Sequence, residues 1–203
     1  MPARADAVFI NVPFDRRYKK LFDGLVFAVH ACGFVARCAR EQDDGSQVRV
    51  DKLYDIIADC RYGIHDLSRT SLDSANRLPR FNMPLELGIF LGAKRFGGPA
   101  QSKKSCLILA KDRYRYQIYC SDIAGQDIRA HEDQLRKAIA AVRDWLRGVR
   151  ASTSIPGPAA IATRYARFTV ALPAMCRALE LDVRELSFLD YRTLVVGWLD
   201  ANP

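Results

Sequence analysis

Residues 81–94 read Phe-Asn-Met-Pro-Leu-Glu-Leu-Gly-Ile-Phe-Leu-Gly-Ala-Lys and predict a helix with a sharp start. Pro84 suits the first helical position, where its missing N–H is no loss, and the Asn82 amide can cap the helix end. The side chains that follow are mostly apolar or small, as expected of a helix that lies against a sheet. Glu86 interrupts this apolar run in the predicted first turn and is therefore the candidate functional residue of the stretch.

The predicted position of Glu86 favours an ionised carboxylate, because the positive end of the helix dipole stabilises the charged form. Such a carboxylate suits attack on, or stabilisation of, a developing cation. Acidic residues are also common in first helical turns simply because they satisfy free N–H groups. The rest of the chain has to decide between these two alternatives.

Strand-like and helix-like segments alternate around this helix. Short β-rich runs occupy residues 7–14, 34–40, 62–67 and 104–110, and helical spacing of apolar residues marks 18–32 and 50–60. This order predicts right-handed crossovers and a parallel sheet with helices on both faces. The fold class is therefore α/β, of flavodoxin-like or Rossmann-like kind.

The chain after Ala110 is harder to assign. Residues 114–120 are a candidate fifth strand, 121–127 form a loop, and the apolar spacing of 135–149 predicts an amphipathic helix. We expect the α/β domain to span residues 1–150.

Residues 151–203 are expected to form a helical extension that packs on the domain or on a partner. The extension opens with a Ser-, Pro- and Gly-bearing linker over 151–158, and two helices follow, the first bent at Pro173. The second helix carries an apolar stripe of Phe188, Tyr191, Val195, Trp198 and Leu199. An uncovered stripe with large aromatic rings would form an exposed patch, so we predict self-association, most simply as a homodimer.

Composition limits the class of protein. The 203 residues are 49% hydrophobic and 27% charged, and they contain no run of about 18 apolar residues that would predict a membrane span. Six cysteines without CxxC spacing and an N-terminus without a signal-peptide pattern predict reduced thiols in a cytoplasmic protein. The net charge of +8 is spread along the chain, which favours nucleotide ligands over long nucleic acids.

Polar side chains gather where the strands of the predicted sheet end. In an open parallel sheet, ligands bind beyond the carboxyl ends of the strands. The candidate substrate-binding residues at this edge are Phe14, Asp15, Arg37, Asp66, Ser68 and Asn82, with Asn11, Arg40 and His65 nearby. Taken singly, each has a structural explanation, such as a helix cap for Asp15 or a turn cap for Asp66, so their convergence is the stronger observation.

Several common sites are missing from the sequence. It contains no GxGxxG turn, no GxxxxGK[ST] loop and no GxSxG elbow, and no His, Cys or acidic cluster has metal-ligand spacing. A phosphoacceptor role for Asp66 would require paired acidic residues after the first strand, where Asn11, Pro13 and Asp15 stand instead.

The order of these motifs resembles a known superfamily over about residues 7–110. A first strand that ends in Pro13-Phe14, a third that ends in Asp66, and a Glu-Leu-Gly helix start at Glu86 are similar to the nucleoside 2-deoxyribosyltransferases and the related NAD-cleaving Toll/interleukin-receptor (TIR) domains. The sequence departs from the transferases just before Glu86, where small residues are usual in the family.

The resemblance implies cleavage of an N-glycosidic bond in a nucleotide or nucleoside, without a cofactor. Glu86 would be the nucleophile or the group that stabilises an oxocarbenium centre, and Phe14 and Asp66 would hold the base. Hydrolysis and transfer both remain open, and so does the leaving base. The alternative is a non-catalytic TIR-like module that senses a nucleotide or self-assembles.

Overall fold

A computed structural model describes residues 4–41, 44–69, 80–150 and 155–203. Within these residues, five parallel strands form one sheet in the order β2-β1-β3-β4-β5. The strands are β1 (Arg4–Asn11), β2 (Val35–Arg37), β3 (Cys60–Asp66), β4 (Ser105–Ala110) and β5 (Ile128–Ala130). This is the flavodoxin-like strand order, so the α/β prediction is confirmed and its flavodoxin-like form is the correct one.

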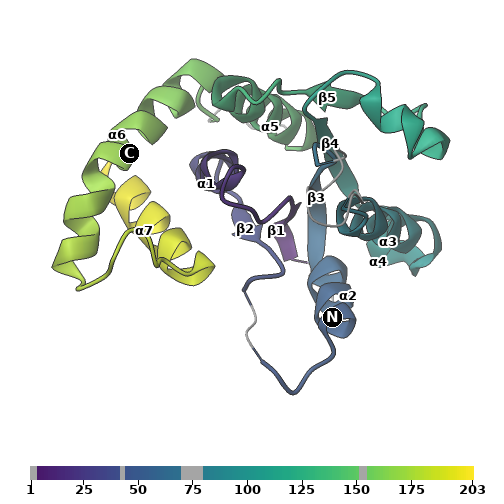
Figure 1. The fold of residues 1–203 in the computed structure, drawn as a ribbon, viewed down its shortest axis with the longest axis horizontal. Coiled ribbons are helices and arrows are strands. Elements are labelled where there is room, and N and C mark those ends of the chain that lie inside the picture. The colour runs from purple at the N-terminus through teal and green to yellow at the C-terminus, as the bar shows by residue number, and fades with distance from the viewer. Residues whose placement is uncertain (1–3, 42–43, 70–79, 151–154) are drawn as a thin grey trace.

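Helices cover both faces of the sheet (Figure 1). On one face lie α1 (Lys19–Ala31) and α5 (Leu135–Val149), which pack against each other. On the other face lie α2 (Arg49–Asp59) and α3 (Asn82–Phe96), and the short helix α4 (Gly98–Ser102) follows α3.

The two faces follow from the alternation of side chains along the strands. In β1, Val8 and Ile10 belong to the core beneath α1 and α5, whereas Ala7 and Phe9 belong to the core beneath α2 and α3. All four side chains are fully buried. A strand buried on both faces reads as a continuous apolar run, which is why β1 is recognisable in the sequence.

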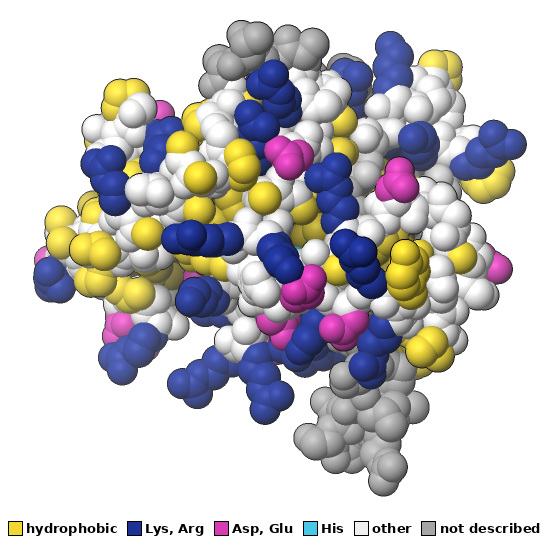
Figure 2. Space-filling model, turned by 90° about the horizontal axis from the view of Figure 1, so that it is seen from above, with side chains coloured by type: hydrophobic (Ala, Val, Ile, Leu, Met, Phe, Trp, Pro, Cys, Tyr) yellow, Lys and Arg dark blue, Asp and Glu magenta, His cyan; other side chains and the backbone are white. Residues whose placement is uncertain are grey.

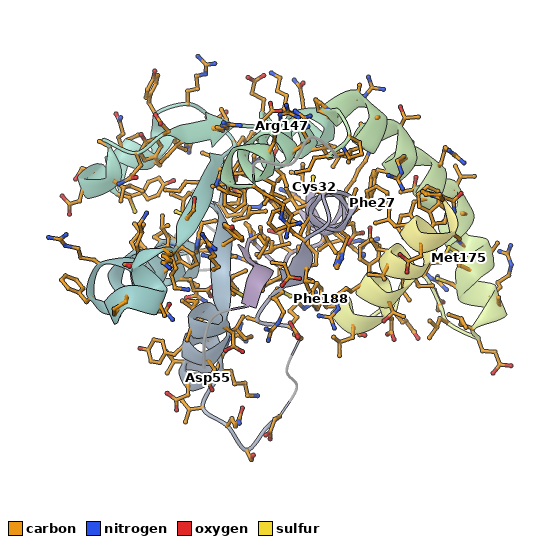
Figure 3. The ribbon with its side chains drawn as sticks, turned by 180° about the vertical axis from the view of Figure 1, so that it is seen from behind. Phe27, Cys32, Asp55, Arg147, Met175 and Phe188 are labelled. Atoms are coloured by element: carbon orange, nitrogen blue, oxygen red, sulfur yellow. The ribbon has the colours of Figure 1, made fainter. Side chains whose placement is uncertain are left out.

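The C-terminal helices α6 (Pro158–Ala178) and α7 (Phe188–Ala201) pack on the outer side of α1. The ring centroid of Phe27 in α1 lies 5.4 Å from that of Phe168 and 5.9 Å from that of Trp198. Figure 3 shows Phe27 and Phe188 in the space between the sheet and these two helices. The apolar stripe of α7 is therefore covered within the chain, and α6 continues as one helix through Pro173.

The fifth strand lies elsewhere than the sequence predicts. Residues 114–120 contain the 3-10 helix η1 (Arg115–Ile118), and Tyr114 has a left-handed φ of 63°, which no strand accommodates. A second short turn, η2 (Ser121–Ile123), precedes the true edge strand β5. With three residues and no fully buried side chain, β5 has no apolar run that marks it in the sequence.

The surface of the described residues is mixed in character. None of the helices described is long and apolar enough to cross a membrane. On the face shown in Figure 2, Lys and Arg side chains are spread among hydrophobic and acidic ones.

Candidate active site

The predicted site lies at the point where the connections from β1 and β3 leave the sheet in opposite directions. The chain after β1 turns into α1 on one face, and the chain after β3 leads to α3 on the other. In this topology the crevice at the carboxyl ends of these two strands is the usual place for a ligand. The structure distributes the predicted residues around this crevice into a buried cluster and two pockets.

Asp66 is the centre of the buried cluster and has no exposed surface. Its Oδ2 accepts a short hydrogen bond from the Tyr18 hydroxyl and lies 3.0 Å from His131 Nε2, while its Oδ1 accepts the Ser68 N–H at 2.7 Å. Burial by itself would raise the pKa of Asp66, but the hydrogen bonds from His131, Ser68 and Tyr18 outweigh it and lower the pKa. The carboxylate is ionised and fully occupied by donors of its own chain.

His131 shows why this cluster is not a Ser-His-Asp triad. Its Nδ1 accepts the N–H of Asp133 at 3.0 Å, so the ring proton of the neutral form is on Nε2. That same Nε2 lies 2.8 Å from Ser68 Oγ and faces Asp66. In a triad, the serine and the aspartate contact opposite ring nitrogens, and only then can the ring carry a proton between them. Here the imidazole joins the end of β3 to the segment that follows β5.

Asp15 closes the turn that precedes α1 and pairs with Arg69. Arg69 donates to both carboxylate oxygens, from Nε at 2.9 Å and from Nη2 at 3.0 Å, and the Tyr18 N–H donates to Oδ1 at 2.9 Å. Burial opposes ionisation, but these donors outweigh it and hold the pKa of Asp15 below its usual range. The two-pronged geometry is the strong form of an Arg–carboxylate pair.

Arg37 and Phe14 lie apart from the Asp66 cluster. The Arg37 guanidinium is almost buried and donates from Nε to Glu41 Oε2 at 2.6 Å. Phe14 is half-buried, and the guanidinium of Arg40 lies 5.4 Å from its ring centroid. The structure thus gives Arg37 a partner in its own chain and places Phe14 at the mouth of a pocket beside α1.

Glu86 lies in a different pocket, between the starts of α2 and α3. The pocket has a volume of about 380 Å³. Its lining residues are Ala39, Arg49, Val50, Lys52, Leu53, Asn82, Leu85 and Glu86. Among them Glu86 is the single acidic residue, and the cationic side chains come from the first turn of α2.

Three details of the predicted helix start are wrong. The helix begins at Asn82, its N-cap residue is Phe81, and no side chain caps it. Asn82 is therefore the first helical residue and not the cap, Pro84 is the third and not the first, and Glu86 belongs to the second turn. Because Glu86 lies beyond the reach of the free N–H groups and is half-buried, burial raises its pKa to about 7, partly opposed by Arg49. The expectation of a readily ionised carboxylate is therefore replaced by a group poised at neutral pH.

Asn11 holds the start of α3 against the sheet. Its buried Nδ2 donates to the Met83 carbonyl at 2.9 Å and lies 3.1 Å from His65 Nδ1. Burial lowers the pKa of His65 to about 3, so the ring is neutral. The Glu86 pocket is thus built on a rigid contact between β1, β3 and α3.

Sequence reasoning overlooked His131, Tyr18, Arg49 and Lys52 as members of these sites. His131 follows β5 directly. Because ligands bind beyond the carboxyl ends of parallel strands, His131 becomes a candidate site residue once the fifth strand is placed correctly. The other three lie at helix starts, and no sequence pattern distinguishes them from surface residues.

The described residues contain no group of three or more His, Cys, Asp or Glu side chains placed to hold a metal ion. No family model matches the sequence, and no curated protein matches it either. The chemistry of the site therefore has to be argued from the geometry of the chain itself.

Proposed function

We propose that this protein cleaves the N-glycosidic bond of a nucleotide or nucleoside, with Glu86 as the nucleophile or the stabiliser of the oxocarbenium centre. The observation that carries the proposal is a half-buried carboxyl group, with a pKa of about 7, in a concave pocket at the start of a helix. A strongly perturbed acid in a pocket beside the switch point of the sheet is the usual mark of a functional site.

The residues that line the pocket can bind the phosphate, the sugar and the base of a nucleotide, and this supports a role for Glu86 at the carbon atom that carries the base. Arg49 and Lys52 supply positive charge that suits a phosphate, and Asn82 supplies an amide that can bind a sugar hydroxyl. The apolar side chains of Val50 and Leu85 supply a surface for a base. A substrate bound through these contacts would present its glycosidic bond to Glu86, and no cofactor would be needed to position it.

The number of carboxyl groups in the pocket also limits the class of substrate that it can cleave. Glycosidases generally use one carboxyl group to protonate the leaving group and a second to attack or activate water. With one acidic residue among the described lining residues, the pocket suits a base that leaves without being protonated first, as the positively charged nicotinamide of NAD does. We therefore place NAD-like nucleotides ahead of neutral nucleosides within this proposal.

The roles of the remaining predicted residues are part of the same proposal. Asp66 and Ser68 would act by holding the carboxyl edge in shape, because the oxygens of Asp66 already accept three hydrogen bonds from the chain. The family resemblance, the cytoplasmic location and the self-association also remain predictions.

The test is release of free base by the purified full chain, incubated with NAD and a panel of nucleosides and followed by chromatography. We expect Glu86→Gln to keep the fold and to reduce base release at least about 100-fold, because it removes the reacting carboxylate. Glu185→Gln is the matched control, because this glutamate is exposed and lies outside the pocket. A wild-type protein that binds nucleotides but releases no base would favour the alternative of a nucleotide-sensing module.

A further inference from the structure

A second pocket lies on the opposite side of the residues that follow β2. Ala39 lines the Glu86 pocket, whereas its neighbour Arg40 lines this one, so the chain at this point forms a wall between the two. The second pocket has a volume of about 280 Å³ and opens between the β1–α1 connection and the loop that joins α6 to α7. The Glu86 pocket shares no lining residue with it, although Phe14, which the family resemblance assigns to the base, lines this second pocket.

One wall of this pocket is formed by three aromatic side chains, each of which contacts the next. The Phe22 ring centroid lies 5.3 Å from that of Phe14 and 6.0 Å from that of Phe188. Phe22 and Phe188 are buried, and Phe14 is half-buried, so the rings are held in place by the core. The pocket thus has a preformed apolar wall.

The rim of the pocket carries positive charge that is not neutralised within the described part of the chain. Its two carboxylates are both engaged, Asp15 by Arg69 and Asp23 by Lys19 at 2.8 Å. Arg16 and Arg40 also line the pocket, and among the described residues neither guanidinium has an ion pair or a hydrogen bond. The Arg40 guanidinium lies over the Phe14 ring, and no described residue accepts a hydrogen bond from its side-chain N–H groups, which can therefore bind a ligand.

The start of α7 beside the pocket does not supply this charge, because Ser187 and Asp190 cap it reciprocally. In the turn before α1, Asp15 accepts the Tyr18 N–H. The attraction for an anion therefore rests on the guanidinium groups. Two of them balance a dianion, which a phosphate monoester is at neutral pH and a single carboxylate is not.

We propose that this pocket is a second ligand site, which binds a small phosphate monoester through Arg16 and Arg40. The organic part of the ligand would lie on the wall formed by Phe14, Phe22 and Phe188. Its volume of about 280 Å³ is at the lower end of ligand pockets, which limits the ligand to about the size of a sugar phosphate. The C-terminal extension then has a function beyond covering α1, because its α6–α7 loop closes the site.

Titration calorimetry with the full chain tests the proposal, with ribose 5-phosphate, ribose and inorganic phosphate as probes. We expect ribose 5-phosphate to bind, ribose not to bind, and inorganic phosphate to bind more weakly, because it lacks contact with the aromatic wall. Arg16→Gln and Arg40→Gln should each weaken the binding of ribose 5-phosphate about tenfold or more, as loss of a charged hydrogen bond predicts. Arg177→Gln, an exposed arginine of α6 outside the pocket, should leave it unchanged.

Three results would overturn the proposal. The first is a wild-type protein that binds none of the phosphate probes, and the second is unchanged affinity in the two arginine variants. The third is equal affinity for inorganic phosphate and ribose 5-phosphate, which would show that the aromatic side chains do not contact the ligand. The Glu86→Gln variant separates this inference from the proposed activity, because it should bind ribose 5-phosphate as the wild type does even if no base is ever released.

Discussion

At the scale of single residues, the proposed reaction depends on Glu86, whose pKa is raised to about 7 by burial. If the ionised carboxylate is the reacting form, kcat/KM for base release should rise with pH and level off above an apparent pKa of about 7 in the free enzyme. A pH–rate profile measured at low substrate concentration checks this. A rate that instead falls as pH rises through 7 would show that Glu86 acts as a proton donor.

The same burial predicts that Glu86 reduces stability. The pKa of Glu86 is about 7 in the folded state, above its ordinary value of 4.5. The folded state therefore keeps the Glu86 proton up to a higher pH than the unfolded state does, and the free energy of unfolding falls as pH rises between these two values. Glu86→Gln should therefore be more stable than the wild type at pH 8, by about 1–2 kcal/mol after allowance for partial exposure. Urea unfolding should show that the gain vanishes below pH 4.5.

At the scale of elements, Asp66 joins β3 to the start of α1 and to the segment after β5. Tyr18→Phe removes one hydrogen bond to a buried carboxylate, and we expect it to lower the free energy of unfolding at pH 7 by about 1.5–3 kcal/mol. The pKa of Asp66 is lowered in the fold, so the stability it contributes is present above its ordinary value of 3.8 and is lost as pH falls further. The effect of the substitution should therefore shrink in acid.

Tyr54→Phe provides the control for this measurement, because Tyr54 is an exposed tyrosine of α2 with 49% of its surface accessible. It should unfold as the wild type does. If Tyr18→Phe behaves like this control at neutral pH, the cluster around Asp66 contributes little to holding the three elements together.

At the scale of the whole molecule, α6 and α7 are part of the main core. Trp198 is 7% exposed and lies against Phe27 and Phe168, so Trp198→Ala should lower the free energy of unfolding by about 3–5 kcal/mol. Val196, on the same helix, is 38% exposed, and Val196→Ala should cost much less. Chemical denaturation of the two variants compares them directly, and equal effects would mean that α7 is not packed as the structure shows.

Self-association stays a prediction, although the residues that first suggested it are covered by α1. Apolar side chains are still exposed on α6 and just after it, with Val170 at 82% and Leu179, the residue that follows the helix, at 59% accessibility. Light scattering on the full chain should give a mass above that of one chain if these side chains contact a second copy. A mass of one chain at high concentration would contradict the prediction.

Sequence patterns alone predict the α/β class, the first four strands and the edge of the sheet at which the polar residues collect. These features follow from local patterns, because β1 and β4 are buried strands that contain apolar runs, and because the carboxyl ends of parallel strands share one edge. The sequence also predicts the position of Glu86 near the start of a helix to within one turn.

Which of those residues contact one another depends on the three-dimensional fold. The contacts of Asp66 with Tyr18 and of Ser68 with His131 join residues 48 and 63 positions apart, and no local pattern encodes such a pairing. The charge state of Glu86 depends on burial by neighbouring elements, which outweighed the helix dipole assumed from its place in the chain. Periodicity and propensity are properties of neighbouring residues, whereas desolvation and hydrogen-bond partners are set by segments that folding brings together.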